Sequence, residues 1–163
     1  MGVPQRIMGS EGVISSPFYP RNYGNGQRCD WLIKVSRGMQ VKLHFTFFHL
    51  EFDSGCRKDF VKLRNGPTLN FPLLGTYCGE MHLPVVHADS GSIYISFQSD
   101  GSNVFKGFQA KFTAVPKIQG SIIIPYILRQ RLFNAVYIRA LYTQYETEFI
   151  HCRKKSLRKQ QLF

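Results

Sequence analysis

The sequence predicts an all-β sandwich that ends at residue 115, followed by a basic tail over residues 116–163. Short segments in the first part alternate apolar and polar residues with the period of two that half-buried strands show. Clusters of Gly, Pro, Asn and Ser separate these segments, and none has a convincing amphipathic helical pattern. The 14 Phe and 8 Tyr of the chain offer enough apolar surface to form a core.

The first two strands are expected at residues 29–35 and 41–48, after an ordered loop at residues 16–26 that is dense in Pro, Gly and Asn. Trp31 lies on the apolar face of the first strand and is expected in the core. In the second strand an inward face alternates with an outward face. The inward face consists of Val41, Leu43, Phe45 and Phe47, and the outward face of Lys42, His44, Thr46 and Phe48.

Further strands are expected at residues 59–64, 73–77, 92–99 and 108–112. The segment at 92–99 alternates most clearly, because every second position is apolar and the positions between are mainly polar. Turn residues separate each strand from the next, and the strand pattern ends just before Pro116. Short strands at this spacing are typical of a sandwich.

Positive charge concentrates in the last third of the chain. Residues 1–115 contain 12 Lys/Arg and 8 Asp/Glu, a net +4, and residues 116–163 contain 9 and 2, a net +7, which together give +11. A partial helical stripe runs through residues 132–149, so we expect a poorly ordered tail or a marginal helix rather than a domain. The tail is interpreted either as a solvated segment or as a contact for an anionic partner, namely a sulfated glycan, nucleic acid or a membrane surface.

Three short acidic segments interrupt the strand pattern and place carboxylates at strand ends. Glu51 follows the second strand, Asp59 opens the next one, and Asp100 lies in a tight loop after residues 92–99. A hard divalent cation such as calcium requires several oxygen ligands, which three loops at one end of a sandwich could supply. Spacing alone leaves two interpretations open, a calcium site and a set of solvated loop residues.

Several segments together resemble the CUB domain family. They are EGVISSPFYPRNY at residues 11–23, CDW at 29–31, FTFFHLE at 45–51, CRKDFV at 56–61, YCG at 77–79, FQSD at 97–100 and GF at 107–108. Each motif is weak alone, but their order along residues 9–115 is specific. The resemblance implies a jelly-roll-like β-sandwich of two antiparallel sheets.

The resemblance also implies a calcium site, because calcium-binding members of the family hold the ion with one Glu and two Asp. The implied ligands are Glu51, Asp59 and Asp100, with the Ser102 carbonyl and Asn103, and Tyr23 is the implied support of the acidic cluster. One divalent cation offsets three carboxylates only in part. The site is therefore expected to receive a Lys or Arg side chain of a protein partner.

The four cysteines contain no Cys-x-x-Cys spacing, which disfavours zinc ribbons and thioredoxin-like redox chemistry. By the resemblance, Cys56 pairs with Cys78, whereas Cys29 lacks its usual partner near residues 1–6. The domain is thus interpreted as clipped at its start. Cys29 is expected to be left free unless Cys152 or a neighbouring chain pairs with it.

Disulfides favour an oxidising compartment, and we expect a secreted or extracellular protein although residues 1–6 contain no apolar signal sequence. The longest apolar run, residues 121–128, is too short to span a bilayer, so no transmembrane segment is expected. The chain is therefore interpreted as a fragment or variant that lacks its export signal.

We expect no enzyme activity, because the serines lack a Gly-x-Ser-x-Gly motif and the five histidines lack metal-ligand spacing. The leading hypothesis is a calcium-dependent extracellular protein-binding module without a nucleic-acid partner. Two alternatives remain open. The first is a glycan- or heparin-binding module that uses the basic surface, and the second is a non-catalytic truncated isoform of a CUB-containing protease or receptor.

Overall fold

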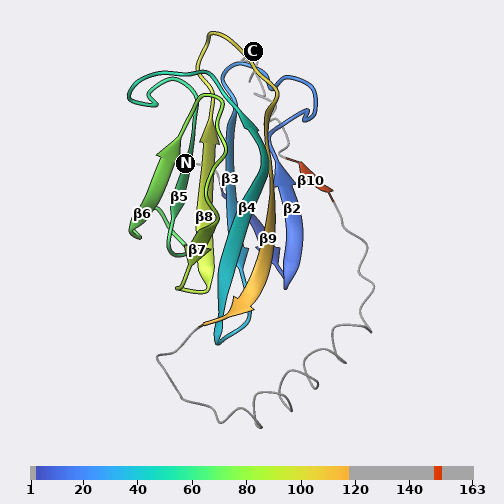
Figure 1. Cartoon of the computed structure of the whole chain (residues 1–163), viewed down its shortest axis with the longest axis vertical. Helices are drawn as coiled ribbons and strands as arrows, with labels where there is room; N and C mark the ends of the chain where they lie inside the picture. The colour runs from blue at the N-terminus through green and yellow to red at the C-terminus, as the bar shows by residue number, and fades with distance from the viewer. Residues whose placement is uncertain (1–2, 118–148, 152–163) are drawn as a thin grey trace, which may run out of the picture.

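The computed structural model describes residues 3–117 and 149–151, which form two facing β-sheets (Figure 1). The strands are β1 (Gln5–Met8), β2 (Glu11–Ser15), β3 (Arg28–Lys34), β4 (Met39–His49), β5 (Phe60–Arg64), β6 (Leu73–Tyr77), β7 (Val86–Ala88), β8 (Ser92–Gln98), β9 (Gly107–Pro116) and β10 (Phe149–His151). The expected all-β sandwich is confirmed. Across the described residues, no helix has the length and apolarity needed to cross a membrane.

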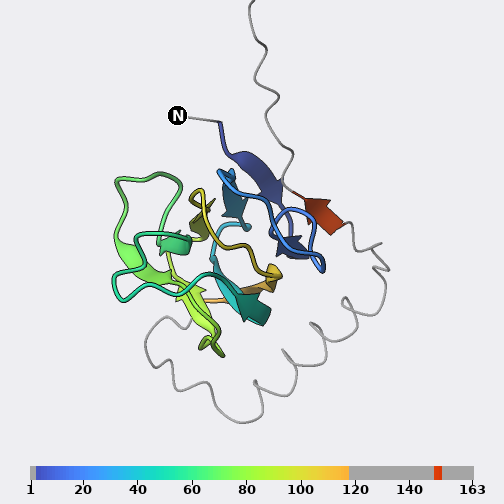
Figure 2. The same cartoon turned by 90° about the horizontal axis from the view of Figure 1, so that it is seen from above.

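The strand order is β1-β3-β8-β5-β6 in the first sheet and β10-β2-β9-β4-β7 in the second. Neighbouring strands run antiparallel except at one edge of each sheet, where β1 pairs with β3 and β10 pairs with β2 in parallel. Figure 2 views the sandwich from above, with the short β10 in red at one side. The two edge strands in these parallel pairs have only 4 and 3 residues, which is too short for an alternating pattern to reveal them in the sequence.

The core lies between the sheets and is rich in aromatic side chains. Trp31 on β3 is fully buried, as expected, and its ring meets that of Phe108 edge to face at a centroid distance of 5.8 Å. Phe108 also contacts Phe45, Phe48 and Phe97 at 5.7, 6.4 and 5.8 Å. Burial of these rings removes a large apolar area from water, which is the main force that holds the sheets together.

The alternation expected along the second predicted strand is wrong at its last two positions. Phe48 is 4 % exposed and lies in the core, whereas Phe47 is half-buried and contacts the Tyr19 ring at a centroid distance of 5.6 Å. The register of β4 against β9 shifts between Phe45 and Phe47. Such a β-bulge adds one residue to the strand, so every later side chain changes face.

Strand β10 lies in the stretch that was expected to form the tail, and it was not predicted. Its three residues pair with Val13, Ile14 and Ser15 of β2. The rest of that stretch, residues 118–148 and 152–163, lies outside the described residues, and so does the expectation of a marginal helix or a poorly ordered tail.

Candidate metal centre

Three carboxylates meet at one end of the sandwich, which is the upper end in Figure 1. Glu51 follows β4, Asp59 precedes β5 and Asp100 follows β8. One carboxylate oxygen from each lies within 4.8 Å of the other two. Glu51 is 4 % exposed and Asp59 is fully buried, so these are not ordinary solvated loop residues. The structure thus brings the three predicted acidic residues together, and their role as metal ligands stays a prediction.

Strand pairing explains why the two aspartates come together. Phe60 of β5 pairs with Gln98 of β8, which places the residue before Phe60 beside the loop that follows β8. The backbone N–H of Asp100 then donates to Oδ1 of Asp59 at 2.8 Å. Two residues far apart in the sequence are thus held by a direct hydrogen bond.

Glu51 reaches the cluster because the chain after β4 pairs briefly with the segment after β6. The N–H of Leu50 donates to the Gly79 carbonyl at 2.9 Å, and the N–H of Gly79 donates to the Glu51 carbonyl at 3.2 Å. These two bonds fix the backbone at Glu51. They therefore fix where the Glu51 side chain leaves the main chain at the edge of the cluster.

Tyr23, in the loop before β3, is hydrogen-bonded to two members of the cluster. Its hydroxyl donates to Asp59 Oδ2 at 2.6 Å and accepts the backbone N–H of Glu51 at 3.2 Å. Burial, together with the bond to Asp59, raises the pKa of the Tyr23 phenol. The neutral hydroxyl thus remains a donor to Asp59 at all physiological pH values.

Burial also raises the pKa of the Asp59 carboxyl, although the hydrogen bonds from Tyr23 and Asp100 act in the opposite direction. A folded-state pKa above the ordinary value means that the ionised side chain opposes folding once the pH exceeds that ordinary value. Asp59 is therefore a buried negative charge for which the fold provides only partial compensation.

Ser102 and Asn103 line the same cluster from the loop before β9. The Ser102 hydroxyl lies 3.1 Å from Glu51 Oε2 and 2.9 Å from Asp100 Oδ1. The Asn103 amide donates to Glu51 Oε1 at 2.8 Å. Both residues contact the acidic cluster, and their role as metal ligands, Ser102 through its carbonyl, stays a prediction.

Lys58 also belongs to the cluster, although it was not predicted from the sequence. Its Nζ lies 2.5 Å from Glu51 Oε1, and its side chain is 44 % exposed. The ion pair lowers the pKa of Glu51 and raises the pKa of Lys58. The sequence feature that points to Lys58 as part of the cluster is its position next to Asp59. That feature is weak, because a lysine at the start of a strand is normally solvated.

The disulfide implied for Cys56 and Cys78 is confirmed. It joins the loop before β5 to the end of β6, beside the Gly79 backbone that holds Glu51. Cys29 is itself disulfide-bonded, so of the alternatives left open for this cysteine the free thiol is excluded. Cys152, one of the alternative partners considered for Cys29, lies outside the described residues.

Asp53 organises the loop that carries Cys56. Its Oδ2 accepts the backbone N–H groups of Gly55 and Arg57 at 3.2 and 3.1 Å, and it also pairs with the Arg57 guanidinium at 3.1 Å. Arg57 holds the pKa of this carboxyl well below its usual range. With its charge engaged inside its own loop, Asp53 stays outside the three-carboxylate group.

The donor set fits a hard divalent cation. The three grouped residues are all carboxylates, with no His or Cys among them. Calcium prefers several oxygen ligands of this kind, whereas zinc sites use nitrogen and sulfur. Three negative charges close together also repel one another, and a bound cation would remove that repulsion.

A model of the CUB domain family matches residues 4–112. The chain is 41% identical over 101 residues to cubilin of Rattus norvegicus, a match that spans 61% of this chain and 3% of cubilin. It is 39% identical over 101 residues to human tolloid-like protein 2, over 62% of this chain and 10% of that protein. The solved CUB2 domain of MASP-1 bound to Ca2+ superimposes with a TM-score of 0.60 at 28% identity, covering 67% of this chain and 96% of that structure.

Proposed function

Because this chain belongs to the CUB domain family, a family of extracellular protein-interaction modules, we propose that it is a calcium-dependent protein-binding module. The observation that carries this proposal is the approach of Glu51, Asp59 and Asp100 to within 4.8 Å of one another. The calcium-bound CUB2 domain of MASP-1 supports the choice of ion.

In this proposal the three carboxylates hold the ion directly, and Ser102 and Asn103 contribute further oxygen atoms. Calcium supplies positive charge at the point where the three acidic loops meet, and it thereby orders their oxygens. Tyr23 keeps Asp59 in place through its 2.6 Å hydrogen bond. Ordering the acceptor groups before a partner arrives lowers the entropy cost of binding.

We propose that a partner protein inserts a Lys or Arg side chain into this cluster. Lys58 supports this mechanism, because its Nζ lies 2.5 Å from Glu51 Oε1 and an ammonium therefore fits beside the carboxylates. With calcium bound, Lys58 and the partner's cation compete for the same residual negative charge. The cation whose donors meet the carboxylate oxygens with the better hydrogen-bond geometry, Lys58 or the partner's Lys or Arg, would bind in preference.

The proposed setting is extracellular, and the proposed role is binding rather than catalysis. A disulfide between Cys56 and Cys78 is stable in oxidising compartments. The full extracellular region of zebrafish Gpr126/Adgrg6 contains a segment with a TM-score of 0.62 to this chain at 29% identity. The chain spans only 3% of rat cubilin and 10% of tolloid-like protein 2.

The test is thermal unfolding of the full chain at increasing calcium concentration. Extracellular calcium modules have dissociation constants on the order of 10⁻⁴–10⁻³ M, so about 10 mM calcium should stabilise the fold by roughly 1–3 kcal/mol. Asp100→Ala should remove this response. Asp89→Ala, which removes an exposed carboxylate in the turn before β8, should retain it. An unchanged melting temperature in calcium would contradict the proposal.

A further inference from the structure

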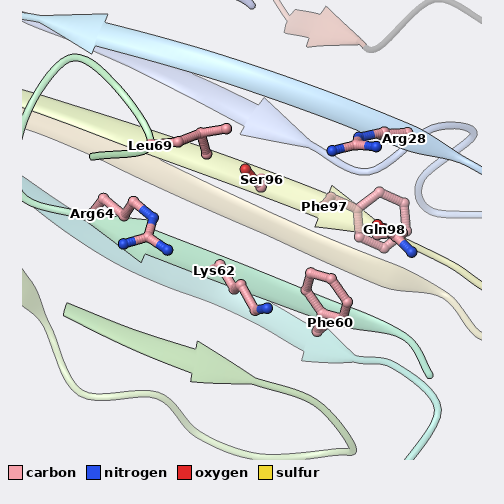
Figure 3. A pocket seen from close by; sticks show the side chains of 8 residues that line it. All are labelled: Arg28, Phe60, Lys62, Arg64, Leu69, Ser96, Phe97 and Gln98. Carbon is pink, nitrogen blue, oxygen red and sulfur yellow. The ribbon is translucent and has the colours of Figure 1, made fainter. Parts of the chain in front are cut away.

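A groove on the outer face of the first sheet carries three cations, Arg28, Lys62 and Arg64 (Figure 3). Its volume is about 240 Å³. The residues that line it are Arg28, Phe60, Lys62, Arg64, Leu69, Ser96, Phe97 and Gln98. No carboxylate is among these lining residues, although acidic residues make up 10 of the 163 positions in the chain.

Strand register brings the cations onto one face. Arg28 of β3 and Phe60 of β5 both pair with Gln98 of β8. Lys62 pairs with Ser96, which lies two residues before Gln98 on β8 and therefore on the same face of the sheet. Lys62 and Arg64 are two residues apart on β5, so their side chains follow each other along the strand. The groove thus combines two cations along one strand with a third across the sheet.

The positive charge in this groove is not consumed by contact ion pairs. Among the described residues, the ion pairs join Arg57 to Asp53, Lys58 to Glu51 and Lys111 to Glu11, and none involves a groove cation.

Two contacts position the groove cations without neutralising them. Lys62 Nζ lies 4.4 Å from the centre of the Phe60 ring, a contact that holds the ammonium and leaves its charge intact. Arg64 donates one bond to the Phe71 carbonyl at 3.0 Å and keeps its other donors.

One carboxylate faces the same side of the sheet. Asp30 lies on β3 opposite Ser96, and it interacts with Tyr94, whose pKa is raised by burial and by this neighbour. The positive charge of Arg28 acts on the same tyrosine in the opposite direction. Asp30 therefore reduces the potential at the β3 side of the groove, and the site is most positive along β5.

We propose that this groove binds the sulfate groups of a sulfated glycan. Guanidinium and ammonium donors match sulfate oxygens, and the amide of Gln98 and hydroxyl of Ser96 provide neutral donors between them. Single-stranded nucleic acid requires exposed aromatic rings for base stacking. Here Phe97 is fully buried and the Phe60 ring is covered by Lys62, which favours the glycan.

The experiment measures binding of the full chain to immobilised heparin by surface plasmon resonance in EDTA, which separates this site from the proposed calcium site. Lys62→Gln/Arg64→Gln should weaken binding at least tenfold and flatten its dependence on salt. Arg28→Gln, on a different strand, should weaken it severalfold. Melting curves of each variant check that the fold is retained.

The matched control is Arg37→Gln/Lys42→Gln, which removes the same two residue types from exposed positions outside the groove. Equal weakening by both double variants would overturn the proposal, because it would assign binding to overall charge or to the basic residues after 117. Desulfated heparin should bind poorly. Competition by a single-stranded oligonucleotide as strong as that by heparin would also overturn the glycan assignment.

Discussion

At the position of Asp59, folding buries a carboxylate that water would otherwise solvate. Burial raises its pKa, so at neutral pH the ionised group opposes folding. Glu51 shows the opposite shift because Lys58 pairs with it. Among the described residues, the three carboxylates make one ion pair, that of Glu51 with the Lys58 ammonium, whose side chain is 44 % exposed. Such a site is expected to bind any cation that is presented with the right geometry.

Lys58→Met tests whether this ammonium competes with calcium. The substitution should raise calcium affinity severalfold, because the ion no longer displaces an attached positive charge. It should also lower the melting temperature in EDTA, where the carboxylates lose their compensating partner. Isothermal titration calorimetry and thermal unfolding measure the two effects.

The control for this prediction is Lys42→Met, which removes an exposed lysine from the middle of β4 and should leave calcium affinity unchanged. If Lys58→Met binds calcium no better than the unaltered chain, the competition is absent. The three-carboxylate site itself would survive that result, because Asp100→Ala tests it separately.

At the scale of the elements, the start of β9 connects the core to the metal centre. Gly107 has a φ of 83°, and a Cβ at this position would lie 1.8 Å from the Ser16 Oγ and 3.3 Å from the Tyr23 ring. The Ser16 hydroxyl accepts the N–H of Phe108 at 3.0 Å. The junction of β2, β9 and the Tyr23 loop thus has no room for a side chain.

Gly107→Ala should therefore destabilise the fold by about 3 kcal/mol, of which backbone strain accounts for roughly 1–2 kcal/mol and overpacking for the remainder. Gly38→Ala is the matched control, because Gly38 has a φ of 84° and an added Cβ would meet no atom within 4 Å. Gly38→Ala should lower the free energy of unfolding only by the contribution of backbone strain. Urea unfolding of both variants measures the difference, and equal losses would show that close packing at Gly107 is unimportant.

At the scale of the whole molecule, the sandwich gathers the loops that follow β2, β4, β6 and β8 at one end, and the cystine Cys56–Cys78 fastens two of them. The sequence separation of the two cysteines is 22. Closing a loop of that size restricts the unfolded chain and contributes about 3 kcal/mol in the chain-entropy model. The same bond lies next to the Gly79 backbone that positions Glu51.

Cys56→Ser/Cys78→Ser should lower the free energy of unfolding by about 3 kcal/mol. It should also weaken calcium binding, because the segment that fixes the Glu51 backbone gains freedom. Denaturant unfolding and calcium titration of the same variant separate the two effects. A loss of stability with unchanged calcium affinity would show that the disulfide supports the fold and not the site.

Much of the fold was predictable because alternation and turn residues are local signals. The segments that became β3, β4, β5, β6, β8 and β9 were all predicted as strands. Strands β1, β2, β7 and β10 were not predicted, and three of them are very short, since β7 and β10 have three residues each and β1 has four. The β4 bulge was also missed, because Phe47 and Phe48 are both apolar and the sequence does not show which of them faces the core.

The order of residues along the chain was enough to predict the all-β class, the family and the acidic residues that a calcium site would use, because residue type and motif order need no knowledge of long-range contacts. The folded arrangement was needed to learn that Glu51, Asp59 and Asp100 approach within 4.8 Å, that Lys58 joins them, and that the groove cations share one face. These facts depend on the register between strands distant in the sequence. Pairing geometry sets that register, and composition does not encode it.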